Sequence, residues 1–167
     1  MDIRRLTPAD ASAYRELRLR ALREHPEAFT SSYEEDSRLP LDVSQQRLNS
    51  PHQRFWGAWE GDLLCGMLGL ECGKRAKDRH KATVVGLYVA PVALGRGTGR
   101  ALISTLVEDA RVSGLQLLVL TVTEGNDAAQ RLYEQAGFRS FGIEPGAVRV
   151  DGRALGKNHM YLELQGR

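Results

Sequence analysis

The most constraining feature of this sequence is a set of three glycines at alternate positions, Gly95, Gly97 and Gly99. The apolar segment before them, residues 82–89, predicts a strand. The segment after them repeats apolar residues at helical spacing and predicts a helix that ends at residues 113–114. Glycine permits close backbone approach, and a helix N-terminus carries partial positive charge. The sequence therefore predicts a phosphate-binding loop between a strand and a helix.

Spacing disfavours two common kinds of phosphate site. A Walker loop has Lys-Ser or Lys-Thr after its last glycine, whereas Arg100 and Ala101 follow here. A dinucleotide-binding loop has the pattern Gly-x-Gly-x-x-Gly and an acidic residue about 20 positions further on. The glycines here alternate, and the corresponding segment, residues 115–119, contains no acid. The pyrophosphate of coenzyme A is the third possibility.

A second segment makes that possibility specific. Asn126 precedes a helix-like stretch that ends Leu-Tyr-Glu-Gln-Ala-Gly-Phe at residues 132–138. This segment and the loop entered through Val-Ala-Pro at 89–91 together resemble the GNAT superfamily of acetyl-CoA-dependent N-acetyltransferases. The resemblance covers residues 54–164 closely and the N-terminal third more loosely. The chain departs from the family at Leu94, where a polar Gln or Arg is usual.

The resemblance implies that acetyl-CoA is the co-substrate, with no metal. The pantetheine arm is expected to pair with the strand backbone near Val89, almost as an added strand, and the pyrophosphate to take N–H groups of the loop. Asn126 is expected to contact the coenzyme or to hold the adjacent strand, although it could be only a helix cap. The expected coenzyme contacts are Leu87, Tyr88, Val89, Leu94, Gly95, Arg96, Gly97, Thr98, Gly99, Arg100, Asn126 and Tyr133.

The resemblance also implies direct transfer from the thioester to an amine in a ternary complex. A strand N–H near Val89 would stabilise the thioester oxygen, and Tyr133 would protonate the leaving thiolate. Tyr133 could instead be a core aromatic residue whose hydroxyl meets a backbone carbonyl. The strand carries no carboxylate from Thr83 to Val89, so the proton acceptor is left open between His80 and water. His80 could equally be a histidine of the basic loop before the strand.

The resemblance assigns the acceptor pocket to the segment after the first predicted helix. Phe29, Ser32, Glu34 and Glu35 are expected to bind the acceptor, with a glutamate holding its ammonium group; the alternative is an exposed acidic loop. The acceptor is expected to be a small-molecule amine, and a protein N-terminus or lysine is the alternative. A non-catalytic acyl-CoA sensor would lack Tyr133, which is present.

Composition bounds the remaining properties. A formal net charge of +2 gives no electrostatic case for binding nucleic acid or membranes. Cys65 and Cys72 would lie on opposite faces of one strand, which excludes a disulfide between them, and no zinc-type spacing occurs. No signal peptide or membrane span is apparent, which favours the cytoplasm, and a homodimer is possible.

The expected fold is a single N-acetyltransferase domain over residues 1–167. It is α/β, with a mixed, largely antiparallel sheet of seven strands, helices on both faces and a splayed central parallel pair. The expected strands are 2–6, 54–60, 63–70, 82–89, 115–122, 138–143 and 158–164, with a turn at Asp151-Gly152 between the last two. Helices are expected at 7–24, at 41–48, after the glycine loop, and from Asn126 to Ala136; residues 27–40 are expected to be irregular.

Overall fold

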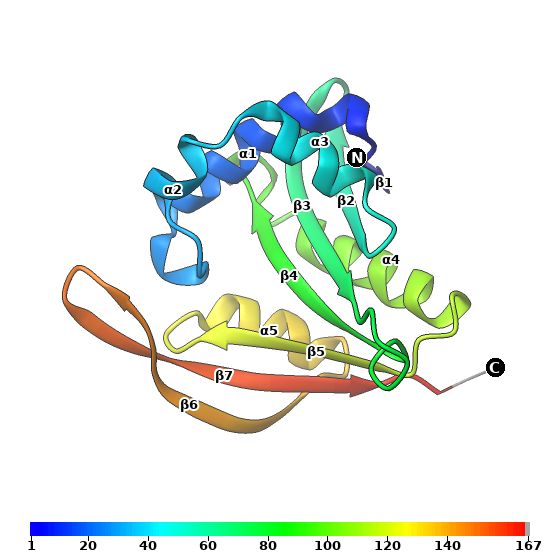
Figure 1. Ribbon diagram of the computed structural model, residues 1–167. Coiled ribbons are helices and arrows are strands. Elements are labelled where there is room, and N and C mark those ends of the chain that lie inside the picture. Colours follow the sequence, from blue (N-terminus) through cyan, green and yellow to red (C-terminus); the bar gives the residue numbers. More distant parts are fainter. Residues whose placement is uncertain (166–167) are drawn as a thin grey trace.

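A computed structural model of the protein describes residues 1–165, which form a seven-stranded sheet with helices on both faces (Figure 1). The strand order is β1-β2-β3-β4-β5-β7-β6, and β4 and β5 are the parallel neighbours. The strands are β1 (Asp2–Arg5), β2 (Gln53–Glu60), β3 (Leu63–Cys72), β4 (Lys81–Val89), β5 (Leu117–Thr123), β6 (Arg139–Val150) and β7 (Arg153–Glu163). The helices are α1 (Ala11–Glu24), α2 (Tyr33–Ser37), α3 (Leu41–Asn49), α4 (Thr98–Val112) and α5 (Asp127–Gln135). This confirms the predicted mixed sheet and its central parallel pair.

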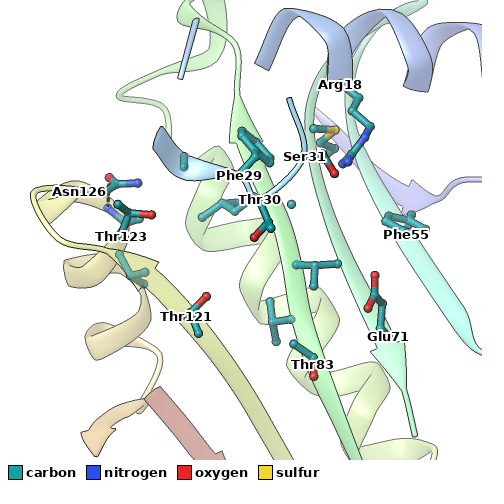
Figure 2. A pocket seen from close by; sticks show the side chains of 18 of the residues that line it. Arg18, Phe29, Thr30, Ser31, Phe55, Glu71, Thr83, Thr121, Thr123 and Asn126 are labelled. Carbon is teal, nitrogen blue, oxygen red and sulfur yellow. Dashed lines mark hydrogen bonds between the residues drawn. The ribbon is translucent and has the colours of Figure 1, made fainter. Parts of the chain in front are cut away.

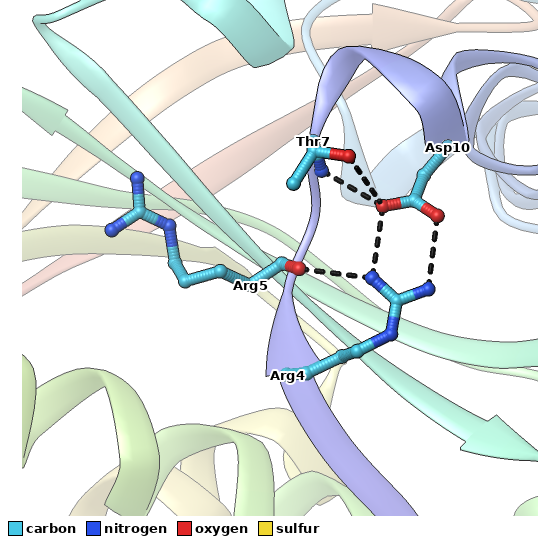
Figure 3. A network of polar contacts seen from close by, with 4 residues as sticks. All are labelled: Arg4, Arg5, Thr7 and Asp10. Atoms are coloured by element: carbon cyan, nitrogen blue, oxygen red, sulfur yellow. Dashed lines mark hydrogen bonds and ion pairs between the residues drawn. The ribbon is translucent and has the colours of Figure 1, made fainter.

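A polar network fixes the connection from β1 to α1 (Figure 3). The Arg4 guanidinium donates to both carboxylate oxygens of Asp10 at 2.9 Å, and the Thr7 backbone N–H donates to Asp10 at 2.8 Å. The same guanidinium lies over the Trp59 ring, 4.4 Å from its centroid. Hydrogen bonding from Arg4 holds the pKa of Asp10 below its usual value. The helix start predicted at Thr7 therefore also anchors the edge strand β1.

The two faces of the sheet carry different helices. A side chain at Gly66 of β3 would meet Thr98 and Leu102 of α4 at 3.2 Å. Three residues further on, Gly69 lies against Phe55 of β2, whose ring packs on Tyr14 of α1. Because successive strand residues point to opposite faces, α1 and α4 cover opposite sides of the sheet.

Helix α5 lies beside α4. A Cβ at Gly99 of α4 would be 3.0 Å from Leu132 of α5, so the two helices approach closely at this glycine. The helices α4 and α5 thus share one face of the sheet, while α1 and α3 lie together on the other, with the Arg47 side chain of α3 donating to the Tyr14 hydroxyl of α1 at 3.3 Å.

The parallel strands β4 and β5 separate soon after they begin (Figure 1). Their pairing covers Lys81–Thr83 against Leu117–Val119 and continues no further within residues 1–165. Strand β4 also holds a bulge toward β3, where Gly86 takes a φ of +68°. The backbone of β4 beyond Thr83 therefore has no strand partner on its β5 side, which confirms the predicted splay.

Two sequence-based boundaries were wrong. Strands β6 and β7 extend as one long hairpin to the predicted turn at Asp151 and Gly152, whose φ values are 50° and 77°. The predicted strands ended at residue 143 and resumed at residue 158, but a register shift between Glu144 and Val148 lets β6 continue past the Pro-Gly pair at 145–146. The segment 27–40 is not irregular throughout, because it holds α2 and most of a 3₁₀ turn at Pro26–Ala28.

Candidate active site

A cavity of about 420 Å³ occupies the gap between the splayed strands (Figure 2). Its walls include β4 from Thr83 to Leu87 and β5 from Thr121 to Thr123. Tyr14 and Arg18 of α1 line it on one face of the sheet, and Ala129 and Tyr133 of α5 line it on the other. Since α1 and α5 cover opposite faces, the cavity passes through the sheet.

The glycine loop has the geometry of an anion-binding site. Gly95 and Gly97 have φ values of 73° and 78°, and a Cβ at either position would meet nothing within 4 Å. Within residues 1–165, none of the backbone N–H groups from Gly95 to Arg100 donates to a protein acceptor. Gly97 is the N-cap of α4, so these N–H groups surround the positive end of that helix.

Tyr133 is a buried side chain in the cavity wall. Its ring packs edge-on against Phe138 with centroids 5.5 Å apart. Its hydroxyl makes no hydrogen bond to any residue that the structure describes, so the bond to a backbone carbonyl that the alternative requires is not formed. Burial raises the pKa of Tyr133 above its ordinary value. The phenol is therefore protonated at neutral pH and free to donate into the cavity.

Asn126 has a structural role and also lines the cavity. Its side-chain oxygen accepts from the Ala129 backbone N–H at 3.3 Å and caps α5. Nearby, the Thr123 hydroxyl donates to the Glu27 carbonyl at 2.7 Å and ties β5 to the segment that follows α1. That segment closes one side of the cavity through Ala28, Phe29, Thr30 and Ser31.

The structure brings few of the other expected acceptor residues to the cavity. Phe29 lines it. Ser32 instead caps α2 by accepting from the Glu35 backbone N–H at 3.1 Å. Glu34 and Glu35 are exposed on α2, away from the cavity lining. Glu34 and Glu35 therefore fit the alternative interpretation, in which this segment is an exposed acidic loop.

His80 also lies away from the cavity lining. It immediately precedes β4 at the closed end of the parallel pair, where its carbonyl accepts from the Gln116 N–H at 2.8 Å and its side chain is exposed. Nine strand positions separate it from Val89, roughly 30 Å along an extended chain. This position counts against His80 as the proton acceptor.

Sequence reasoning missed the carboxylate that does line the cavity. Glu71 lies on β3 directly opposite Thr83 of β4, and both residues line the cavity (Figure 2). The Glu71 side chain is also exposed to solvent. Its Oε1 accepts from the Gln53 side chain at 3.4 Å. The absence of acids on β4 was read correctly, but the acid stands on the neighbouring strand. The register between β3 and β4 places it there, and the spacing of residues along the chain does not give that register.

The other residues that were expected to contact the coenzyme differ in how they could reach it. The Tyr88 side chain points toward α1, where its hydroxyl donates to Glu24 at 2.5 Å, and burial raises the pKa of Tyr88 to about 12. Tyr88 can therefore reach a ligand in the splay only through its backbone. In the loop, Leu94 is exposed, and Arg96 pairs with Glu60 at 3.4 Å.

Residues 1–165 contain neither a cluster of metal ligands nor a helix suited to span a membrane. No group of three or more His, Cys, Asp or Glu side chains gathers there in a way that would hold a metal ion. Helices long and apolar enough to cross a membrane are also missing from that range. Cys65 and Cys72 are free thiols, as their spacing predicted.

This fold and this site define an acyltransferase: a sheet opened between two parallel strands, with an anion-binding loop beside the opening. The sequence model of the acetyltransferase (GNAT) family matches residues 17–138, and the chain belongs to that family.

Individual relatives agree with this assignment. N-alpha-acetyltransferase RimI of Mycobacterium tuberculosis is 33% identical over 118 residues, covering 70% of this chain and 72% of that protein. The L-methionine sulfoximine/L-methionine sulfone acetyltransferase of Salmonella typhimurium is 34% identical over 91 residues, and the match spans about half of each chain, 54% and 53%. The structure of yncA from Salmonella typhimurium, solved with its cofactor acetyl-CoA, shares the fold with a TM-score of 0.87 and 24% identity, covering 100% of this chain and 95% of that one.

Proposed function

We propose that this protein is an N-acetyltransferase that moves an acetyl group from acetyl-CoA directly to the amine of a small molecule. The observation that carries the proposal is the cavity that passes through the sheet. A coenzyme entering from the α4 and α5 face and an acceptor entering from the α1 face would meet within it. The family membership and the acetyl-CoA bound in the related yncA structure support the choice of donor.

The coenzyme would bind along structural features that lack internal partners. Its pyrophosphate would accept from the N–H groups of residues 95–100. Its pantetheine arm would pair with the unpaired edge of β4 at Leu87, Tyr88 and Val89, as an added strand does. This path would bring the thioester into the cavity near Tyr133.

The transfer would form one bond and break one. The neutral amine nitrogen attacks the thioester carbonyl, and N–H groups of the bulged part of β4 stabilise the negative charge that develops on its oxygen. The C–S bond then breaks, and Tyr133 donates its proton to the leaving thiolate. Burial raises the pKa of Tyr133, and the same dry surroundings would raise the pKa of the leaving thiol, so the proton transfer would depend on direct contact between the two groups.

The attacking amine must also lose a proton. Glu71 is the one carboxylate among the described residues that line the cavity, so we assign it to hold the acceptor's ammonium group and to accept this proton, directly or through water. We therefore no longer assign the proton acceptor to His80, or the binding of the ammonium group to Glu34 and Glu35. None of these three residues lines the cavity.

The size of the cavity supports a small acceptor. A space of about 420 Å³ suits a small molecule better than a folded protein surface. An acetyltransferase for a protein N-terminus is the alternative, favoured by the similarity to RimI. A panel of small amines and N-terminal peptides, assayed by release of free coenzyme A thiol, distinguishes the two.

Replacing Tyr133 with Phe tests the chemistry. The variant keeps the ring against Phe138 and loses the hydroxyl, so kcat should fall roughly 10²- to 10⁴-fold while coenzyme affinity stays close to that of the wild type. Tyr33→Phe is the matched control, because Tyr33 lies outside the cavity and its hydroxyl contacts Arg23. Unchanged turnover in Tyr133→Phe would remove Tyr133 from the mechanism.

We also propose that β6 forms the interface of a homodimer. It is one of the two edge strands of the sheet, and Phe141 and Ile143 on it are 58% and 61% exposed. Light scattering on Phe141→Asp and wild-type protein tests this: a monomer in the variant and a dimer in the wild type are expected, and a monomeric wild type overturns it.

A further inference from the structure

Cationic side chains dominate the acceptor side of the cavity. Arg18 of α1, Arg47 of α3 and Lys157 of β7 line it, against Glu71 as the carboxylate. Lys157 is already engaged, since its ammonium donates to the Thr30 hydroxyl at 2.8 Å. Arg18 and Arg47 lie close to each other, because both also line a small cleft between α1 and α3.

Arg47 is a half-buried charge without a counterion. Within residues 1–165 it forms no ion pair, and its one polar contact is the donation to the Tyr14 hydroxyl at 3.3 Å. A guanidinium has five N–H donors, so most of the hydrogen-bonding capacity of Arg47 is unused. A partly desolvated charge is stabilised by a neighbouring anion, and an anionic group of a ligand bound in the cavity would provide one.

Arg18 is held in place beside it. Its Nε donates to Asp36 of α2 at 2.6 Å, and the two side chains are only 15% and 10% exposed. That bond fixes the guanidinium and leaves its terminal nitrogens for the cavity; Figure 2 shows the Arg18 side chain extending from α1 toward Ser31. Tyr14 and Arg18 are one helical turn apart, so one face of α1 presents both groups.

The phosphates of the coenzyme do not account for this pair of arginines. The loop at residues 95–100 begins α4, which covers the face of the sheet opposite α1 and α3. Arg18 and Arg47 therefore stand on the side from which the acceptor would enter. Planar guanidinium groups of this kind match the two oxygens of a carboxylate.

We infer that the acceptor is an amine that also carries a carboxylate, such as an amino acid, and that Arg47 and Arg18 bind the carboxylate. This inference rests on the proposed function and narrows its substrate class. Glu71 of β3, the carboxylate among the described lining residues, then receives the amine end of the molecule, so the cavity offers a zwitterion both cationic and anionic partners. A bound carboxylate would fix the orientation of the amine toward β4.

Matched acceptor pairs test the inference: amino acids and their α-carboxamides, which differ in the charge of one group. Thiol release is measured for each pair with the wild type, Arg47→Gln and Arg38→Gln, an exposed control outside the cavity lining. We expect the acids to exceed the amides at least tenfold in kcat/KM, mainly through KM. Arg47→Gln should remove that advantage, whereas Arg38→Gln should keep it. Amides have more neutral amine at neutral pH, so the chemistry alone favours them.

Equal or better turnover of the amides by the wild type would overturn the inference while leaving the transferase function intact. An equal loss for acids and amides in Arg47→Gln would also overturn it. If no small amine is acetylated although coenzyme A binds, the proposed function fails instead. Thermal unfolding of the coenzyme A complex then decides about the carboxylate site. Stabilisation by acids but not amides, lost in Arg47→Gln and Arg18→Gln, supports the site, and no difference overturns it.

Discussion

Replacing Gly97 with Ala should weaken coenzyme binding far more than it weakens the fold. Gly97 has a φ of +78° and is the N-cap of α4, and a Cβ there would meet nothing within 4 Å. The cost is therefore conformational, about 1–2 kcal/mol for a left-handed residue with a side chain. If the loop relaxes to relieve that strain, its N–H groups turn away from the pyrophosphate. Each hydrogen bond lost to a charged acceptor is worth about 1.5–3 kcal/mol, or roughly 10- to 100-fold in Kd.

Gly114→Ala provides a control at the other end of the same helix. Gly114 has a φ of +86°, follows the C-cap Ser113, and also has nothing within 4 Å of a Cβ. The two variants should lose similar free energy of unfolding in urea. Isothermal titration calorimetry with coenzyme A should show weaker binding in Gly97→Ala alone. Wild-type affinity in Gly97→Ala, with the same loss of stability as in Gly114→Ala, would refute the loop as the pyrophosphate site.

Two further predictions follow from side-chain contacts. Hydrogen bonding from Arg4 lowers the pKa of Asp10 in the folded protein, so this pair stabilises the fold above the unfolded pKa, near 4, and its contribution is lost as the pH falls through the folded pKa. Urea unfolding should show Asp10→Asn less stable than wild type at pH 7, by under about 1 kcal/mol because Arg4 is largely exposed, with the difference vanishing in strong acid. Glu71→Gln should lower kcat at least tenfold without changing coenzyme affinity, whereas Glu34→Gln should change neither; a Glu71→Gln variant with normal kcat would leave water as the proton acceptor.

The parts of the site that could be predicted from the sequence are those built from one continuous segment. The loop around Gly97 and the helix carrying Tyr133 each contain their own pattern of glycines, caps and apolar residues. The strand-like runs on either side of α4 likewise predicted the parallel pair. Local spacing was sufficient in these places because the backbone geometry is set within a few residues.

The acceptor side could not be predicted in the same way. Glu71 reaches the cavity through its register opposite Thr83, and Arg47 reaches it because α3 packs on α1. Neither the strand register nor the helix packing can be deduced from the spacing of residues along the chain. The long β6–β7 hairpin was missed for a related reason, since the bulge near Pro145 depends on the partner strand and not on the local sequence.

In the proposed mechanism, donor and acceptor meet in the splay and react directly. Among the described residues, no cysteine lines the cavity, so no thiol is positioned there to form an acetyl-enzyme intermediate. The direct measurement is a single turnover of acetyl-CoA on excess enzyme, with and without an acceptor amine that the panel identifies. Direct transfer predicts that thiol release requires the amine and that mass spectrometry finds no acetylated protein when the amine is left out. Rapid thiol release without the amine, matched by an acetyl group on the protein, would contradict it.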